Sequence, residues 1–163
     1  MSAIKTFSGL AALMLLIAGC ALTPVSVGMS RAQVLEQYGK PSRVLALPNG
    51  TRLQYSSQPA GQSVMVLDLD AADTVLAVRQ MMTRAELLKI EPGTWTRERV
   101  ESEFGPPASI DRVGSWSGDI MSYRWRDSMQ DMFFWVYLDG NQVVQRTGQG
   151  MDIPMRPRLF GRD

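Results

Sequence analysis

The sequence predicts an α+β fold in which two tandem repeats each contain one helix followed by a three-stranded antiparallel meander. The first observation is a segment that occurs twice, as MSRAQVLEQYGKPSRV at residues 29–44 and as WTRERVESEFGPPASI at residues 95–110. At one register the two copies match like for like, in Ser30 and Thr96, Val34 and Val100, Tyr38 and Phe104, Gly39 and Gly105, and Pro41 and Pro107. The second observation is that three runs rich in β-branched and aromatic residues follow each copy. A duplicated unit of helix and meander explains both observations.

Each copy has the pattern of a short capped helix. In the first copy Ser30 is the expected N-cap, and Gln33 completes a capping box with it. Gly39 is expected to end the helix, and the proline two residues later prevents its continuation. Thr96 and Gly105 have the same places in the second copy. The sequence therefore predicts one helix at the start of each repeat.

Strand-like runs, separated by turn residues, follow each helix. The runs are TRLQYSS, SVMVLDL and TVLAVRQ in the first copy, and DIMSYRWRD, MFFWVYL and QVVQRT in the second. A helical link is predicted over residues 83–91, so that residues 28–82 form the first repeat and residues 83–150 the second. Residues 151–163, which contain several Pro and Arg residues, are predicted to be an extended tail.

The first residues have the composition of an export signal. One positive charge at Lys5 precedes the apolar run LAALMLLI, and small residues then lead to Cys20, the only cysteine in the chain. The apolar run is much shorter than the roughly 20 residues that span a bilayer. Residues 17–20, IAGC, resemble the bacterial lipobox, in which the signal is cut before the cysteine and the thiol is acylated.

The lipobox resemblance implies a lipoprotein signal peptide at residues 1–19 and a lipidated tether at residues 20–27. Two or more acyl chains on Cys20 would give durable attachment to a membrane. Position 21 is Ala, whereas the enterobacterial pattern that retains lipoproteins at the inner membrane has Asp there. The resemblance therefore implies the periplasmic leaflet of the outer membrane.

The composition argues against most catalytic, metal-binding and nucleic-acid-binding functions. The chain has no histidine, which removes Ser-His and Cys-His nucleophile pairs and most zinc sites. Its 17 basic and 16 acidic residues are nearly balanced, whereas a nucleic-acid partner favours a basic excess. Asp68, Asp70 and Asp73 lack the central glycine and the final glutamate of an EF-hand loop. The sequence thus predicts a protein that is not an enzyme and that uses no cofactor and no metal.

The second meander is the strongest candidate for a surface that binds a protein partner. Along YRWRD, Tyr123 and Trp125 alternate with Arg124 and Arg126, and residues of MFFWVYL alternate in the same way. Tyr, Trp and Arg contribute most of the binding energy at protein interfaces. The candidate partner-binding residues are Trp116, Tyr123, Arg124, Trp125, Arg126, Phe133, Trp135 and Tyr137. Two interpretations remain: these aromatic residues fill the seam between the repeats, or one set of them forms an exposed binding platform.

The first copy resembles the SmpA/OmlA (BamE) family of outer-membrane lipoproteins. Residues 27–34, VGMSRAQV, together with Gly39 and Pro41, are similar to the family signature G-M-[ST]-x-x-Q-V…G-x-P. The second copy departs from it, because residues 94–96 read Thr-Trp-Thr and Arg99 replaces the glutamine. Two such units in tandem resemble the fold of the β-lactamase inhibitor protein, in which the open sheet face contacts the partner.

These resemblances imply an outer-membrane-anchored, non-enzymatic protein-interaction module in cell-envelope or outer-membrane protein assembly. The alternative is a membrane-tethered inhibitor of a periplasmic enzyme. The tether favours assembly, because an inhibitor gains less from being fixed at a membrane. The duplication favours inhibition, because the single-repeat lipoproteins need only one unit for assembly. The expected partners are the membrane, through the lipid on Cys20, and envelope or outer-membrane proteins.

Overall fold

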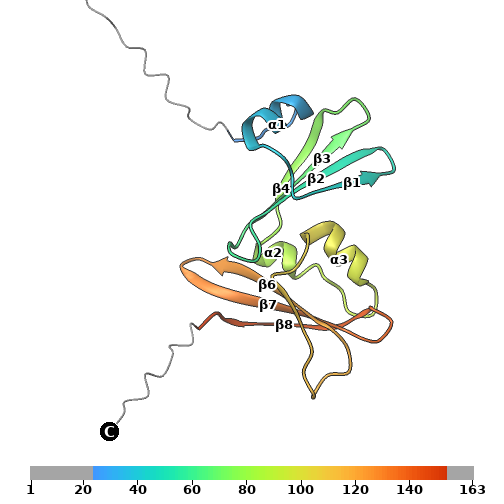
Figure 1. The fold of residues 1–163 in the computed structure, drawn as a ribbon, viewed down its shortest axis with the longest axis vertical. Helices are drawn as coiled ribbons and strands as arrows, with labels where there is room; N and C mark the ends of the chain where they lie inside the picture. Colours follow the sequence, from blue (N-terminus) through green and yellow to red (C-terminus); the bar gives the residue numbers. More distant parts are fainter. Residues whose placement is uncertain (1–23, 154–163) are drawn as a thin grey trace, which may run out of the picture.

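The computed structural model describes residues 24–153, which form three short helices and eight strands (Figure 1). In chain order the elements are α1 (Arg31–Tyr38), β1 (Arg43–Leu47), β2 (Gly50–Ser56), β3 (Val64–Asp70), β4 (Val75–Gln80), α2 (Arg84–Leu87), α3 (Arg97–Phe104), β5 (Ser109–Asp111), β6 (Ile120–Asp127), β7 (Gln130–Leu138) and β8 (Val144–Met151). The predicted signal peptide, the start of the tether with Cys20, and residues 154–163 of the predicted tail lie outside the described residues.

The predicted fold class is wrong, both in its repeating unit and in its balance of helix and strand. The described chain is predominantly β: β1 to β4 form one four-stranded antiparallel sheet, and β5 to β8 form a second. The strands that the sequence pattern missed are β1 and β5. Both are edge strands whose residues are half-buried or exposed, so no run of buried apolar residues marks them. Pairing with β2 and β6 defines them instead.

The helices are short, and their starts follow the sequence. The hydroxyl of Ser30 accepts from the backbone N–H of Gln33, and the N–H of Ser30 donates to the Gln33 side chain at 2.8 Å, which completes the capping box of α1. Thr96 caps α3 through the N–H of Arg99. Because an arginine side chain has no acceptor, the reciprocal bond of the box cannot form there. The predicted link over residues 83–91 contains only the single turn α2.

The same local contacts occur in both sheets. Gly39 and Gly105 end α1 and α3 with φ of 71° and 74°, values that favour glycine. The hydroxyl of Tyr55 on β2 donates to the carbonyl of Gly39 at 3.0 Å, and that of Tyr123 on β6 donates to the carbonyl of Gly105 at 2.9 Å. In each unit a tyrosine of the second strand thus ties the end of the helix to the sheet.

The turns β3–β4 and β7–β8 are also alike. Asp70 accepts from two backbone N–H groups of its turn, each at 2.9 Å, and Asp139 does the same in the second unit. Asp70 is thereby committed to a turn. Within the described residues no group of three His, Cys, Asp or Glu side chains is placed to hold a metal ion.

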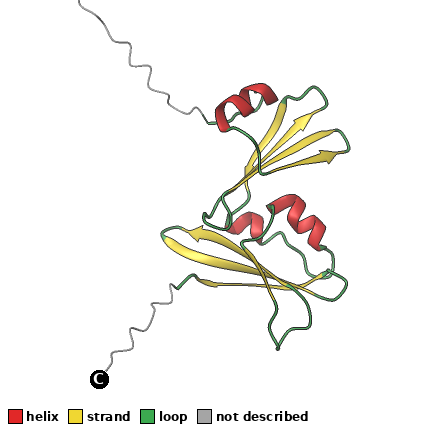
Figure 2. Ribbon diagram, in the orientation of Figure 1, coloured by secondary structure: helices red, strands yellow, loops and turns green. Residues whose placement is uncertain are grey.

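The elements stack in layers, as Figure 2 shows. α1 lies on one face of the first sheet, where Val34 packs in a core with Leu53 and Leu67. α2 and α3 lie between the two sheets. There Val66 of β3 joins Val100 of α3 and the inward-facing residues of the second sheet in one larger core. Helices therefore cover both faces of the first sheet but only one face of the second.

A buried arginine fixes the first sheet to α3. The side chain of Arg52 is 8% exposed, and its guanidinium contacts Asp68 at 2.6 Å and Glu103 of α3 at 2.8 Å. Arg79 lies 3.0 Å from the same Asp68. Gln54 donates to a backbone carbonyl of α3 at 2.8 Å. These charge-assisted and amide contacts hold the first sheet against α3.

Electrostatics and burial act in opposite directions on this cluster. Burial alone would lower the pKa of Arg52, but the hydrogen bonds with Asp68 and Glu103 raise it above its ordinary value. Burial likewise raises the pKa of Asp68, yet Arg52 and Arg79 together bring it below the usual range of an aspartate. Both groups are therefore charged at neutral pH.

Candidate partner-binding face

The predicted partner-binding residues divide between the two faces of the second sheet. Tyr123 and Trp125 point inward and are 0% and 1% exposed, so they belong to the core between the sheets. The remaining six residues lie on the opposite side: Arg124 and Arg126 of β6, Phe133, Trp135 and Tyr137 of β7, and Trp116, which packs against Tyr137. We call this side the outer face; its central residues are Phe133, Trp135 and Tyr137, all of them partly exposed. Side chains alternate between the two faces along each strand, and the register pairs Tyr123 of β6 with Phe134 of β7. Tyr123 and Phe134 therefore share the inner face, and Phe133 lies on the outer one.

The three outer aromatic rings follow one another along β7. The rings of Phe133 and Trp135 are nearly parallel, with centroids 6.2 Å apart and 18° between their planes. Trp135 pairs with Gly148 of β8, and its indole leans over both Gly148 and Gly150. A Cβ at Gly150 would lie 2.8 Å from the Trp135 ring. The absence of side chains at these glycines lets the indole lie close to the sheet.

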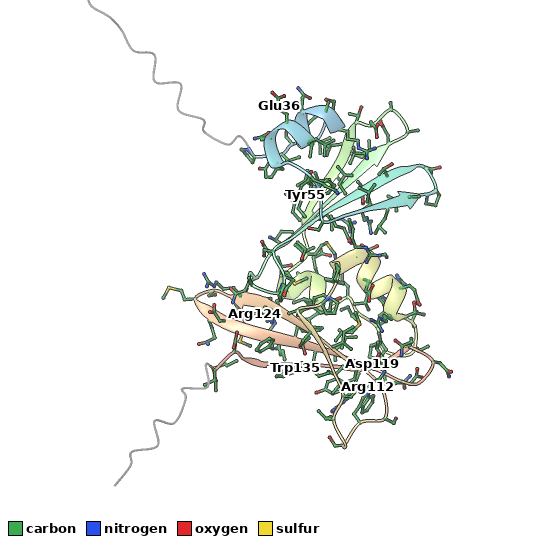
Figure 3. The ribbon with its side chains drawn as sticks, viewed as in Figure 1. Glu36, Tyr55, Arg112, Asp119, Arg124 and Trp135 are labelled. Atoms are coloured by element: carbon green, nitrogen blue, oxygen red, sulfur yellow. The ribbon has the colours of Figure 1, made fainter. Side chains whose placement is uncertain are left out.

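Arginines surround these rings. Arg124 lies over Phe133 at 5.9 Å and forms an ion pair with Asp152 at 2.7 Å. Arg126 forms an ion pair with Asp131 at 2.9 Å. Figure 3 shows Arg124 and Trp135 on the second sheet. Arginine stacked on aromatic rings is a common element of protein interfaces.

Arg146 of β8 was not predicted from the sequence, and it has the closest arginine–ring contact of this face. Its guanidinium lies 3.9 Å from the centroid of Tyr137 and 5.2 Å from that of Trp116. Trp116 in turn meets Tyr137 edge to face at 5.3 Å, and its indole N–H donates to the carbonyl of Leu138 at 2.7 Å. Arg146, Gly148 and Gly150 occupy alternate positions of the segment QRTGQGM and therefore share one face of β8. Glycines at alternate strand positions are the sequence signal that could have indicated a face on which a large side chain lies close to the backbone.

An open pocket of about 300 Å³ lies at one end of the outer face. It is lined by Asp111, Val113, Ser115, Trp116, Ile120, Ser122, Trp135, Tyr137 and Arg146. The β5–β6 loop forms one wall, and an ion pair between Arg112 and Asp119 at 2.6 Å closes the base of that loop (Figure 3). The Arg112 hydrogen bond lowers the pKa of Asp119, so the pair is charged at neutral pH. The pocket can hold side chains of a partner on an aromatic floor.

A larger pocket, of about 480 Å³, opens on the first sheet. The pairing registers place Ser57 and Ser63 where the second unit has Trp125 and Met132, so small residues replace large core residues there. The pocket on the first sheet is lined by Tyr38, Lys40, Ser42, Tyr55, Ser56, Ser57, Ser63, Met65 and Gln80. In the second unit Met81, Met82 and Leu87, around α2, pack into the corresponding core. The hollow thus follows from the missing counterpart of α2 among the described residues.

Comparisons with known proteins leave the chain without an assigned family. No family model matches the sequence, and no curated protein matches it. Among solved structures the chain is similar to a DUF4309 family protein (YjgB) from Bacillus subtilis, with 17% sequence identity, a TM-score of 0.33, and coverage of 76% of this chain and 78% of that one. A likeness at this TM-score supports no conclusion about fold or role. Among the described helices none is long and apolar enough to cross a membrane.

Proposed function

We propose that this chain is a BamE-like outer-membrane lipoprotein, anchored through acylated Cys20, that acts as a non-enzymatic protein-interaction module in envelope or outer-membrane protein assembly. The outer face of the second sheet is its contact surface. The lipobox-like residues 17–20 support the anchor, and the SmpA/OmlA-like residues 27–34 support the role in assembly.

One observation supports the contact surface most directly: helices pack on both faces of the first sheet, whereas no described helix or strand packs on the outer face of the second, where only the β2–β3 loop reaches Arg124. That face holds two Trp, one Tyr and one Phe, with Arg124 and Arg146 stacked on them. Such aromatic and arginine residues form the energetic centres of protein interfaces. These four rings are partly exposed, and apolar surface left open to solvent favours an interaction site.

The proposal is tested by photocrosslinking in intact cells with the tether present. A photoreactive residue at Phe133 should capture a protein of the outer-membrane assembly machinery or a membrane-embedded barrel. The matched control is a photoreactive residue at Leu76, a residue of β4 that is 57% exposed. This control should not capture these proteins. Trp135→Ala, with folding verified by circular dichroism, should reduce the capture, whereas Leu76→Ala should not. Equal capture from both positions would overturn the outer face as the contact surface.

The open aromatic face also favours the alternative, a tethered inhibitor of a periplasmic enzyme. This second candidate predicts a different captured protein: one soluble hydrolase, whose activity falls when the purified chain is added. The same crosslinking experiment separates the two, because assembly components are membrane-embedded or anchored. Capture of a hydrolase that Trp135→Ala no longer inhibits would replace assembly with inhibition.

A further inference from the structure

One cross-strand row of the outer face has opposite charges at its two ends. The strand registers pair Asp111 of β5 with Ile120 of β6, Ile120 with Tyr137 of β7, and Tyr137 with Arg146 of β8. From one edge of the sheet to the other, the row therefore consists of an acidic, an apolar, an aromatic and a basic residue. Since neighbouring strands are about 4.8 Å apart, the backbones at its two ends are about 14 Å apart. The Arg146 side chain extends inward from its end, so that its guanidinium lies over Tyr137.

The charges at the ends of this row are the ones that the outer face leaves without an ionic partner. Arg112, Arg124 and Arg126 each form an ion pair with a carboxylate. Arg146 contacts two aromatic rings, and no described carboxylate lies within ion-pair distance of it. Asp111 accepts from the hydroxyls of Ser109 and Ser122 and has no described cation within that distance.

The row also has walls that suit a single extended chain. Trp116 and the β5–β6 loop stand on one side of it, and Trp135 of the next row stands on the other. Residues four apart in an extended segment are about 13 Å apart and point to the same side. The middle residue of such a segment points to that side as well and would enter the pocket beside Ile120, between the rings of Trp116 and Trp135.

We propose that the partner docks an extended segment of the form acid–x–apolar–x–base across this row. Its carboxylate pairs with Arg146, its basic group with Asp111, and its apolar side chain fills the pocket between Trp116 and Trp135. The inference rests on the proposed binding role and specifies the chemistry of the partner. Arg146 is suited to this role because its planar guanidinium, already in contact with two rings, can donate two parallel hydrogen bonds to a carboxylate.

The test uses the full-length chain in detergent and three capped peptides of defined sequence: Glu-Thr-Leu-Thr-Lys, Gln-Thr-Leu-Thr-Lys and Glu-Thr-Leu-Thr-Gln. Binding at millimolar concentration is followed through the indole N–H signals of Trp116 and Trp135 in nitrogen-15 spectra. The first peptide should shift both signals. Each neutralised peptide should bind about three- to fivefold more weakly, as expected for a solvent-accessible ion pair.

Two exposed single-residue variants separate the ends of the row. Arg146→Gln should abolish the advantage given by the peptide's glutamate and preserve that given by its lysine, and Asp111→Asn should do the reverse. High salt should remove both advantages. Equal binding of all three peptides, or the same ranking in both variants, would overturn the inference. An absence of shifts with any peptide would also overturn it, while the proposed function would survive if Trp135→Ala still reduced capture in cells.

Discussion

The two sheets of this chain are built alike but covered differently. In each, a capped helix ends at a glycine whose carbonyl accepts from a tyrosine of the second strand, and an aspartate closes the last turn. The first sheet packs against α1 on one face and against α3 on the other. The second sheet packs against α2 and α3 on one face only. The same architecture thus serves as an internal support in one unit and presents an open surface in the other.

The residue types on each face follow this difference. Where the first sheet meets α3 it presents Arg52, Gln54 and Asp68, which are satisfied by ion pairs and by carbonyls of the helix. The open face of the second sheet presents aromatic rings with arginines stacked on them. At the junction these polar groups are enclosed beside the apolar core of Val66 and Val100, while the rings of the open face remain partly exposed. This difference is the physical reason to propose a partner for the second sheet.

The largest effect should separate the two faces of the second sheet itself. Trp125→Ala removes a fully buried indole from the core and should lower the free energy of unfolding by about 3–5 kcal/mol. Trp135→Ala on the outer face should lower it by less, about 1–2 kcal/mol, because the indole is partly exposed and its loss leaves no enclosed cavity. Trp125→Phe is the control for the loss of polar contacts: the Trp125 indole nitrogen has no described hydrogen-bond partner, so the phenylalanine should be tolerated much better. Urea unfolding measures all three, and similar losses for both alanine variants would contradict the assignment of faces.

A smaller effect should come from the polar junction of the first sheet. Arg52→Met leaves Asp68 half-buried with only Arg79 beside it and should cost about 2–3 kcal/mol, less than for a fully buried pair. Arg31→Met, at the exposed pair with Asp73, is the matched control and should cost less than about 0.5 kcal/mol.

The stability lost in Arg52→Met should depend on pH, and it should become smaller in acid. Because the pKa of Asp68 is lowered in the folded chain, its contribution is present above the unfolded pKa of about 3.9 and is lost as the pH falls through the folded value. The gap in unfolding free energy between wild type and Arg52→Met should therefore narrow below about pH 4. A gap that is unchanged in acid would show that the arginine acts by packing alone.

The sequence predicted the parts of this fold that depend on local signals. Ser30 and Thr96 are N-caps as expected, and Gln33 completes the capping box with Ser30, because capping is decided within four residues. The edge strands β1 and β5 were missed because pairing with β2 and β6 defines them, not a buried apolar pattern. The direction of each aromatic residue could not be predicted either, since it depends on the register between β6 and β7. Arg146 was missed for the same reason: only the register places it beside Tyr137.

A still smaller effect should distinguish the two equivalent tyrosines. Tyr123→Phe leaves the buried carbonyl of Gly105 without its donor and should cost about 1–2 kcal/mol. Tyr55→Phe removes the equivalent bond in the first unit, but Gly39 is exposed and water can replace the hydroxyl, so the cost should be about 0.5 kcal/mol or less. Chemical denaturation of the two variants compares one contact in two environments. Equal costs would mean that burial does not set the strength of this bond.

The most specific change in the surface, with only a small change in stability, should come from Gly150→Ala. The added Cβ would lie 2.8 Å from the far end of the Trp135 ring, which is partly exposed and can swing away, so the free energy of unfolding should fall by less than about 1 kcal/mol. The displaced indole should alter the fluorescence of Trp135 and its spacing from Phe133. Gly140→Ala, in a turn where a Cβ meets nothing within 4 Å, is the matched control. If capture by the outer face falls with Gly150→Ala and not with Gly140→Ala while both variants stay folded, then the flat position of Trp135, and not merely its presence, determines binding. Unchanged capture would limit the contact to the other end of the face, around Trp116 and Arg146.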